Sequence, residues 1–89
     1  MKIKEGFILR KIAGEDIVVP IGNNIADFNG VIRLNESAGF LWKTLQEEIS
    51  KEDLISSLIK EYEIDETLAT KDVEGFLSIL EEHKAIEGI

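Results

Sequence analysis

The sequence predicts an α+β fold in which a three-stranded antiparallel sheet is followed by three helices. In the first third of the chain, short apolar runs are separated by glycine-containing turns, which is typical of strands. In the remainder, apolar residues recur about every 3.6 residues, which is the period of an amphipathic helix. Strands and helices that are segregated along a chain of 89 residues predict one domain over residues 1–89, with strands at about 7–34 and helices at about 36–83.

The three strands are expected at residues 7–12, 17–21 and 30–34. The turn at residues 13–16 contains a glycine and two acidic residues, and Pro20 marks the end of the second strand or an edge position. Gly22 and two asparagines signal a further turn, but residues 22–29 receive no assignment beyond it. Two hairpin-like connections predict an antiparallel meander.

Each predicted helix follows a residue whose side chain is suited to an N-cap, namely Asn35, Ser50 or Asp65. The apolar face of the first helix consists of Ala38, Leu41, Trp42, Leu45 and Ile49, and that of the second of Leu54, Ile55, Leu58, Ile59 and Tyr62. The third helix is expected to run to about His83.

The third helix has more apolar surface than one core requires. Its apolar arc covers about half of the circumference, whereas a stripe of ~100° suffices to face a core. The predicted core side is formed by Ala69, Val73, Phe76, Leu77 and Leu80, and a flank by Leu68, Asp72, Gly75, Ile79 and His83. This flank either lines a groove that contains a carboxylate or is covered by the strands, and the helical wheel leaves both possibilities open.

The amino-acid composition argues against most kinds of catalytic site and metal site. The chain has no cysteine, and His83 is the only histidine, so a zinc site is not expected and a capping role at the helix end is the simpler interpretation. There is no glycine-rich phosphate loop and no nucleophile–base motif. We therefore predict a binding protein that is not an enzyme, with no catalytic residue, metal or cofactor. No secretory signal or apolar run of ~18 residues is present, so a cytoplasmic location is expected.

Three segments, taken together and in order, are similar to the coenzyme PQQ synthesis protein D family. Residues 33–42 (RLNESAGFLW) resemble its x-L-N-x-[ST]-A-x-x-[IL]-[WL] segment. Residues 53–62 (DLISSLIKEY) resemble a second segment that ends in Glu-Tyr, and residues 72–80 (DVEGFLSIL) resemble its D-V-x-x-F-L-x-x-L pattern. The likeness covers nearly the whole chain, except that residues 22–29 have no counterpart and residues 85–86 (AI) replace a usual Gly-Leu-[ILV] ending.

The resemblance implies a winged-helix-like arrangement and a function in peptide recognition. Members of the family bind the leader of a ribosomally made precursor peptide and present the precursor to a modifying enzyme, often a radical SAM protein. The leader adds as a strand beside the third strand and lies against the third helix. The family name does not fix the product, so the PQQ precursor is one possible partner among several.

Carried onto this sequence, the resemblance predicts the peptide-binding residues Val31, Ile32, Arg33, Leu68, Asp72, Gly75, Phe76 and Ile79. In this hypothesis Leu68, Phe76 and Ile79 hold apolar leader side chains. Gly75 allows close approach of the leader backbone. Asp72 accepts a hydrogen bond from a leader lysine, arginine or backbone N–H.

Three other interpretations compete with this one. A winged-helix regulator that binds nucleic acid is disfavoured because residues 35–89 carry five lysines against fourteen acidic residues, within a net charge of −8. An enzyme is disfavoured because the chain lacks a nucleophile–base arrangement of side chains. A self-associating domain remains open because an exposed strand edge can pair with a second copy, so we expect a monomer or a weak homodimer, which sedimentation over a dilution series would distinguish.

Overall fold

The computed structural model of the protein describes residues 1–22 and 31–88, and the sequence stretch 22–29 that received no assignment lies almost wholly outside them. In chain order the elements are β1 (Lys2–Ile3), β2 (Phe7–Ile12), β3 (Glu15–Pro20), β4 (Ile32–Leu34), α1 (Glu36–Thr44), α2 (Lys51–Tyr62), α3 (Glu66–Glu82) and β5 (Ile86–Glu87). The strands β2, β3 and β4 form an antiparallel sheet in that order, followed along the chain by the three helices. The predicted α+β class is confirmed.

The β2–β3 hairpin is tighter than the sequence suggested. Ala13 and Gly14, at its tip, have φ angles of 53° and 82°, so the turn consists of these two residues alone. Two consecutive positive φ angles give a turn whose twist matches that of the flanking strands. Consequently β3 begins at Glu15 rather than at residue 17, and it ends at Pro20 rather than at residue 21.

The third strand is shorter than predicted. β4 comprises only Ile32–Leu34, and its ladder with β3 pairs Val18 with Ile32, Ile17 with Arg33 and Asp16 with Leu34. Val31 therefore lies just before the strand and not in it, and its side chain is exposed. The strand predicted at residues 30–34 is therefore too long at its start, since the ladder with β3 stops at Ile32; residue 30 lies outside the described residues.

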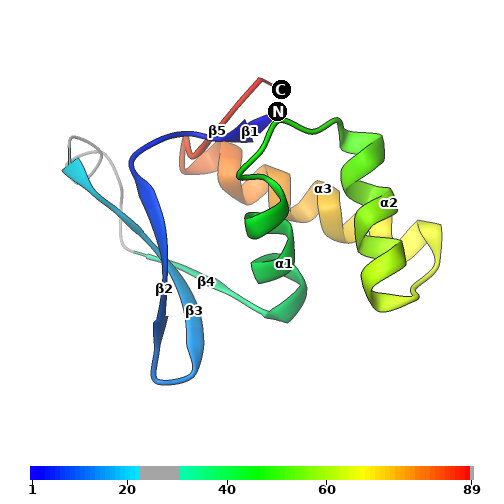
Figure 1. Cartoon of the computed structure of the whole chain (residues 1–89), viewed down its shortest axis with the longest axis horizontal. Coiled ribbons are helices and arrows are strands. Elements are labelled where there is room, and N and C mark those ends of the chain that lie inside the picture. Colours follow the sequence, from blue (N-terminus) through cyan, green and yellow to red (C-terminus); the bar gives the residue numbers. More distant parts are fainter. Residues whose placement is uncertain (23–30, 89) are drawn as a thin grey trace.

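A second, very short antiparallel ribbon was not predicted from the sequence. β1 pairs with β5 in antiparallel register, with Ile3 opposite Ile86, and so joins the two ends of the described chain (Figure 1). The amide of Ile3 also donates to the carbonyl oxygen of Leu45 at 2.9 Å. Two-residue strands are too short to show an alternating pattern, so no local signal marked them.

The three predicted N-caps are confirmed. The Asn35 side chain accepts a hydrogen bond from the Ala38 amide at 2.9 Å, Ser50 accepts one from Asp53 at 3.1 Å, and Asp65 accepts one from Leu68 at 2.7 Å. At the other end of α3, Nδ1–H of His83 donates to the Ile79 carbonyl oxygen at 2.9 Å, as expected of a capping histidine.

The first helix ends earlier than its apolar pattern predicted. α1 stops at Thr44 with Leu45 as its C-cap, so Ile49 is not on its face. The chain instead turns toward the start of the sequence, where the Ile49 amide donates to the Met1 carbonyl oxygen at 3.1 Å. Ile49 still packs against the core, because the loop returns it there.

The main core lies between the sheet and the helices. All five residues of the predicted core side of α3 are buried: Ala69, Val73, Phe76, Leu77 and Leu80. On the predicted flank, the side chains of Leu68 and Ile79 are 45% and 42% exposed, so the strands do not cover the whole apolar arc. No helix within the described part of the chain is long and apolar enough to cross a membrane.

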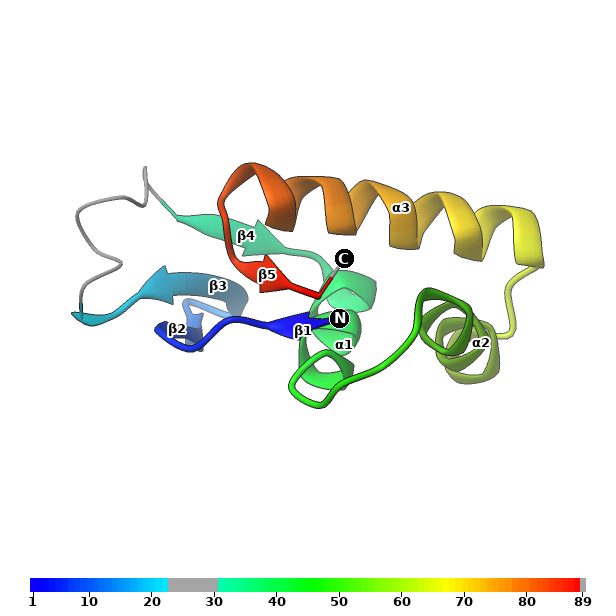
Figure 2. The same ribbon diagram turned by 90° about the horizontal axis from the view of Figure 1, so that it is seen from above.

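Close packing of α1 on the sheet fixes the position of β4. Gly39 in α1 lies against Asp16 of β3, and a Cβ atom added to Gly39 would lie only 2.7 Å from the Asp16 Oδ2 atom. Asp16 pairs with Leu34, the last residue of β4, which leads through Asn35 into α1. In Figure 2 β4 lies alongside the C-terminal half of α3, and the two elements run in opposite directions.

Candidate functional site

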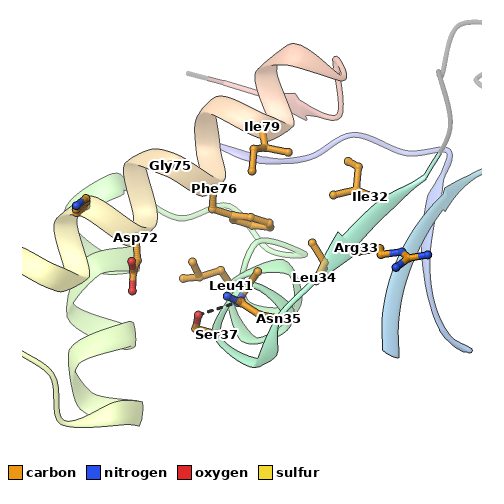
Figure 3. A pocket seen from close by; sticks show the side chains of 12 residues that line it. Ile32, Arg33, Leu34, Asn35, Ser37, Leu41, Asp72, Gly75, Phe76 and Ile79 are labelled. Atoms are coloured by element: carbon orange, nitrogen blue, oxygen red, sulfur yellow. Dashed lines mark hydrogen bonds between the residues drawn. The ribbon is translucent and has the colours of Figure 1, made fainter. Parts of the chain in front are cut away.

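A hollow of about 440 Å³ opens between β4, the start of α1 and α3, and we call it the β4–α3 groove (Figure 3). Its lining consists of Ile32, Arg33, Leu34, Asn35, Ser37, Ala38, Leu41, Lys71, Asp72, Gly75, Phe76 and Ile79. All three elements are tied to the core, so the walls of the groove are held in place by the fold itself.

The interior of the groove is apolar. Ile32 and Leu34 alternate with Arg33 along β4 and both face the groove, whereas the Arg33 side chain points to the other side of the sheet (Figure 3). The Phe76 ring extends from α3 toward Leu34 and Leu41, and the Phe76 side chain is only 4% exposed. Apolar side chains of a ligand could therefore be removed from water against Ile32, Leu34 and Phe76.

One side of the groove is an open strand edge. Within residues 1–22 and 31–88, β4 pairs with β3 alone, so its other edge carries no partner strand. An unpaired edge presents backbone N–H and C=O groups that can accept another extended chain. The groove thus combines backbone hydrogen-bonding groups on β4 with apolar side chains on both walls, which suits an extended peptide.

Polar groups gather at the end of the groove nearest the start of α1. The Asn35 side chain oxygen already accepts hydrogen bonds from the Ala38 amide and from the Ser37 hydroxyl, the latter at 3.1 Å. Across the groove, Asp72 is half-buried and makes no ion pair within the described residues. Its carboxylate is therefore available to a ligand cation or N–H group.

The part of the sequence that forms the groove matches a known family. The family model described as coenzyme PQQ synthesis protein D (PqqD) matches residues 15–86, which include β3, β4 and all three helices. The chain belongs to the PqqD family. This confirms the resemblance that the three sequence segments indicated.

Two solved structures share the PqqD-family fold of this chain. The first is described as TbiB1 in complex with the TbiA(beta) leader peptide and has a TM-score of 0.76 at 21% sequence identity. The match covers 100% of this chain and 98% of that chain. The second, a lasso peptide synthetase B1 complexed with the leader peptide, has a TM-score of 0.73 at 18% identity, with coverages of 98% and 96%. Comparison with curated protein sequences finds no match.

The structure brings most of the predicted site residues together. Ile32, Arg33, Asp72, Gly75, Phe76 and Ile79 line the β4–α3 groove, although Arg33 does so without directing its side chain into it. Leu68 lies instead in a neighbouring hollow of about 330 Å³, which shares Asn35, Ser37 and Asp72 with the groove and so continues it along α3. Val31 lines neither hollow.

Sequence reasoning missed the contribution of α1 to this PqqD-family groove. Asn35 carried only a capping signal, Ser37 carried no signal of its own, and Leu41 belonged to an apolar face that predicts core packing. Leu41 is indeed buried, yet it also forms part of the groove. No periodicity in one helix shows where a second element will leave an opening.

Tyr62 closes one side of the neighbouring hollow. Its ring packs edge-on against Phe40, with ring centroids 5.8 Å apart, and its hydroxyl donates to the Glu36 carbonyl oxygen at 3.3 Å. Partial burial raises the pKa of Tyr62 above its ordinary value, and the carboxylates of Glu36 and Glu61 raise it further. The folded state therefore favours the neutral phenol, which contributes to the free energy of unfolding. This contribution is fully present below the pKa that Tyr62 has in the unfolded chain, and it is lost as the pH rises through the pKa of Tyr62 in the folded protein.

A spectrophotometric titration tests this assignment. Tyr62 is the only tyrosine, so the phenolate absorbance reports on it alone. We expect the midpoint for the folded protein to lie above that of the chain in concentrated urea, which should be about 10. Phe40→Ala, which removes the packed ring, should bring the two midpoints closer. A folded midpoint at or below the unfolded one would contradict the raised pKa of Tyr62.

Proposed function

We propose that the protein binds the leader of a ribosomally synthesised precursor peptide and presents the precursor to a modifying enzyme. One observation carries the proposal: the unpaired edge of β4 faces an apolar groove on α3 in a chain of the PqqD family. The two similar structures support it, since each is described as a complex with a leader peptide. The leader adds to β4 as a further strand, with backbone hydrogen bonds giving affinity and side-chain contacts giving selectivity.

In this proposal the predicted peptide-binding residues differ in how they contact the leader. Ile32, Phe76 and Ile79 contact apolar leader side chains, and Asp72 accepts a hydrogen bond from a leader lysine, arginine or N–H group. Arg33 acts through its backbone, because its side chain points away from the groove. Val31 extends the pairing edge by one residue, and Leu68 contacts a leader that continues past Asp72 into the neighbouring hollow.

Catalysis belongs to the partner in this proposal. Among the described residues, no group of three histidine, cysteine, aspartate or glutamate side chains could hold a metal ion. We propose that the chain is a non-enzymatic peptide chaperone, in the cytoplasm, for a peptide-modifying enzyme such as a radical SAM protein. Nucleic acid is a poor partner for this chain, since its net charge is −8 and Glu66, Glu74 and Glu81 are exposed along α3.

NMR titration of the labelled protein tests the proposal. The probe is the leader half of the short precursor reading frame encoded nearest to the gene. We expect chemical shift changes concentrated in residues 31–34 and 68–79, because these surround the groove. A DNA duplex is the matched control and should cause no localised change. Shifts confined to the outer face of the sheet, or no shifts with the leader, would refute the proposed site.

A further inference from the structure

Gly75 leaves a gap in the helical wall of the groove. Leu68, Asp72, Gly75 and Ile79 follow one another at intervals of four, three and four residues, so they lie along one stripe of α3. The other three positions carry side chains along this wall, and Gly75 carries none (Figure 3). Apart from its two chain neighbours and the backbone of its own helix, a Cβ atom added to Gly75 would have no heavy atom within 4 Å, so no side chain from elsewhere in the fold fills the gap.

Nothing within the described fold requires glycine at this position. The left-handed backbone region, which favours glycine, is occupied at Gly6, Gly14, Gly22 and Gly88 but not at Gly75. Close packing does not require it either, in contrast to Gly39, where an added Cβ would collide with Asp16. Glycine inside a helix is less stable than alanine, so its presence here is unfavourable for folding alone.

The spacing of an added strand matches the gap. In a strand that pairs with β4, every second side chain faces α3, at intervals of about 6.8 Å. Along α3, Gly75 is separated from Ile79 by about 6 Å and from Asp72 by about 4.5 Å. A leader side chain opposite Gly75 would therefore have its next helix-facing neighbour close to Ile79 on one side or to Asp72 on the other.

We propose that Gly75 determines the specificity of the groove by admitting one large apolar or aromatic leader side chain between Asp72, Phe76 and Ile79. This inference rests on the proposed function, because it assigns one subsite of the same groove. The walls of the subsite are the Phe76 ring and the Ile79 side chain, so apolar contact dominates. The Asp72 carboxylate at its border disfavours an acidic side chain there.

A display selection tests the assignment with random peptides in place of the natural leader. A library of random dodecapeptides is selected on the wild-type protein and on Gly75→Leu, which fills the gap. Peptides selected on the wild type should share one position occupied by Phe, Tyr, Trp, Leu or Met. Those selected on Gly75→Leu should carry Gly, Ala or Ser at that position and keep their other preferences.

Affinities of individual peptides complete the test. A peptide selected on the wild type should bind Gly75→Leu with an affinity lower by about tenfold or more, because the added side chain overfills the subsite. Shortening its large residue to alanine should remove most of that difference between the two proteins. Gly75→Ala should give an intermediate affinity in a more stable helix, so a loss of binding there cannot come from unfolding. The matched control Ser78→Leu, exposed on the same helix but outside the groove, should bind like the wild type.

The outcomes separate this inference from the proposed function. If wild-type-selected peptides compete with one another and lose affinity on Ile79→Asp but bind Gly75→Leu unchanged, the groove is correct and the role of Gly75 is wrong. If the selection on the wild type enriches no peptide, or if Ile79→Asp has no effect on those it enriches, the proposed peptide-binding function of the groove fails as well.

Discussion

Replacing Ile79 with aspartate is expected to weaken leader binding by about 1–3 kcal/mol, or roughly 5- to 150-fold in Kd. Ile79 lies at the rim of the β4–α3 groove, where its side chain points toward Ile32 and is 42% exposed in the free protein. A bound leader would remove this surface from water. An aspartate there loses the apolar contact and must also be desolvated without a partner. Fluorescence anisotropy of a labelled leader measures the change directly.

The Ile79→Asp result is interpretable because folding should be nearly unaffected. Ile79 is already partly in water, so its replacement leaves no buried cavity. Ser78→Asp is the matched control, since it adds the same charge to the same turn of α3 outside the groove. It should retain the wild-type affinity. Equal losses for both variants would show that charge on α3, rather than contact at Ile79, governs binding.

Leu68→Asp extends the same test along α3. Leu68 lies in the neighbouring hollow, beyond Asp72 from the main groove. A loss of affinity there as well would mean that the leader spans both hollows, and no loss would limit it to the main groove. If neither Leu68→Asp nor Ile79→Asp changes the affinity, the leader does not bind along this stripe of α3.

Local chemistry made the helices and the groove-facing side of α3 predictable from the sequence. A cap depends on one side chain and an amide three residues later, so Asn35, Ser50 and Asp65 could be identified without any tertiary information. The wheel of α3 separated buried Leu80 from exposed Ile79 because both positions obey the same helical period. The wide apolar arc left two possibilities, a groove or coverage by the strands, and the exposure of Leu68 and Ile79 favours the groove.

Features that depend on distant partners were not predictable in this way. The β1–β5 ribbon pairs Ile3 with Ile86, which lie at opposite ends of the described chain. After the early end of α1, the Ile49 amide bonds to the carbonyl oxygen of distant Met1, which no local pattern reveals. The groove likewise depends on where α1 approaches α3, so Leu41 and Ser37 could not be assigned to it from their own helix alone.

Shortening Leu80 to alanine is expected to destabilise the protein by about 2–5 kcal/mol, the largest stability effect that we predict. Leu80 is fully buried, and it does not line the β4–α3 groove. Removing its side chain both forfeits buried apolar contact and leaves a cavity beneath α3. For a chain of 89 residues such a loss corresponds to a fall in the melting temperature of about 4–8 °C for each kcal/mol. Urea unfolding followed by circular dichroism measures it.

Leu68→Ala provides the matched control, because it makes the same substitution on the same helix where the side chain is 45% exposed. We expect it to cost no more than about 0.5–1 kcal/mol. At a temperature where both variants are folded, Leu80→Ala should still bind the leader with nearly wild-type affinity, whereas Ile79→Asp should not. Two adjacent residues of α3 would then affect different properties, stability at Leu80 and recognition at Ile79, because the helix places one in the core and the other at the groove. If Leu80→Ala costs no more stability than Leu68→Ala, the packing of α3 on the core is not as described.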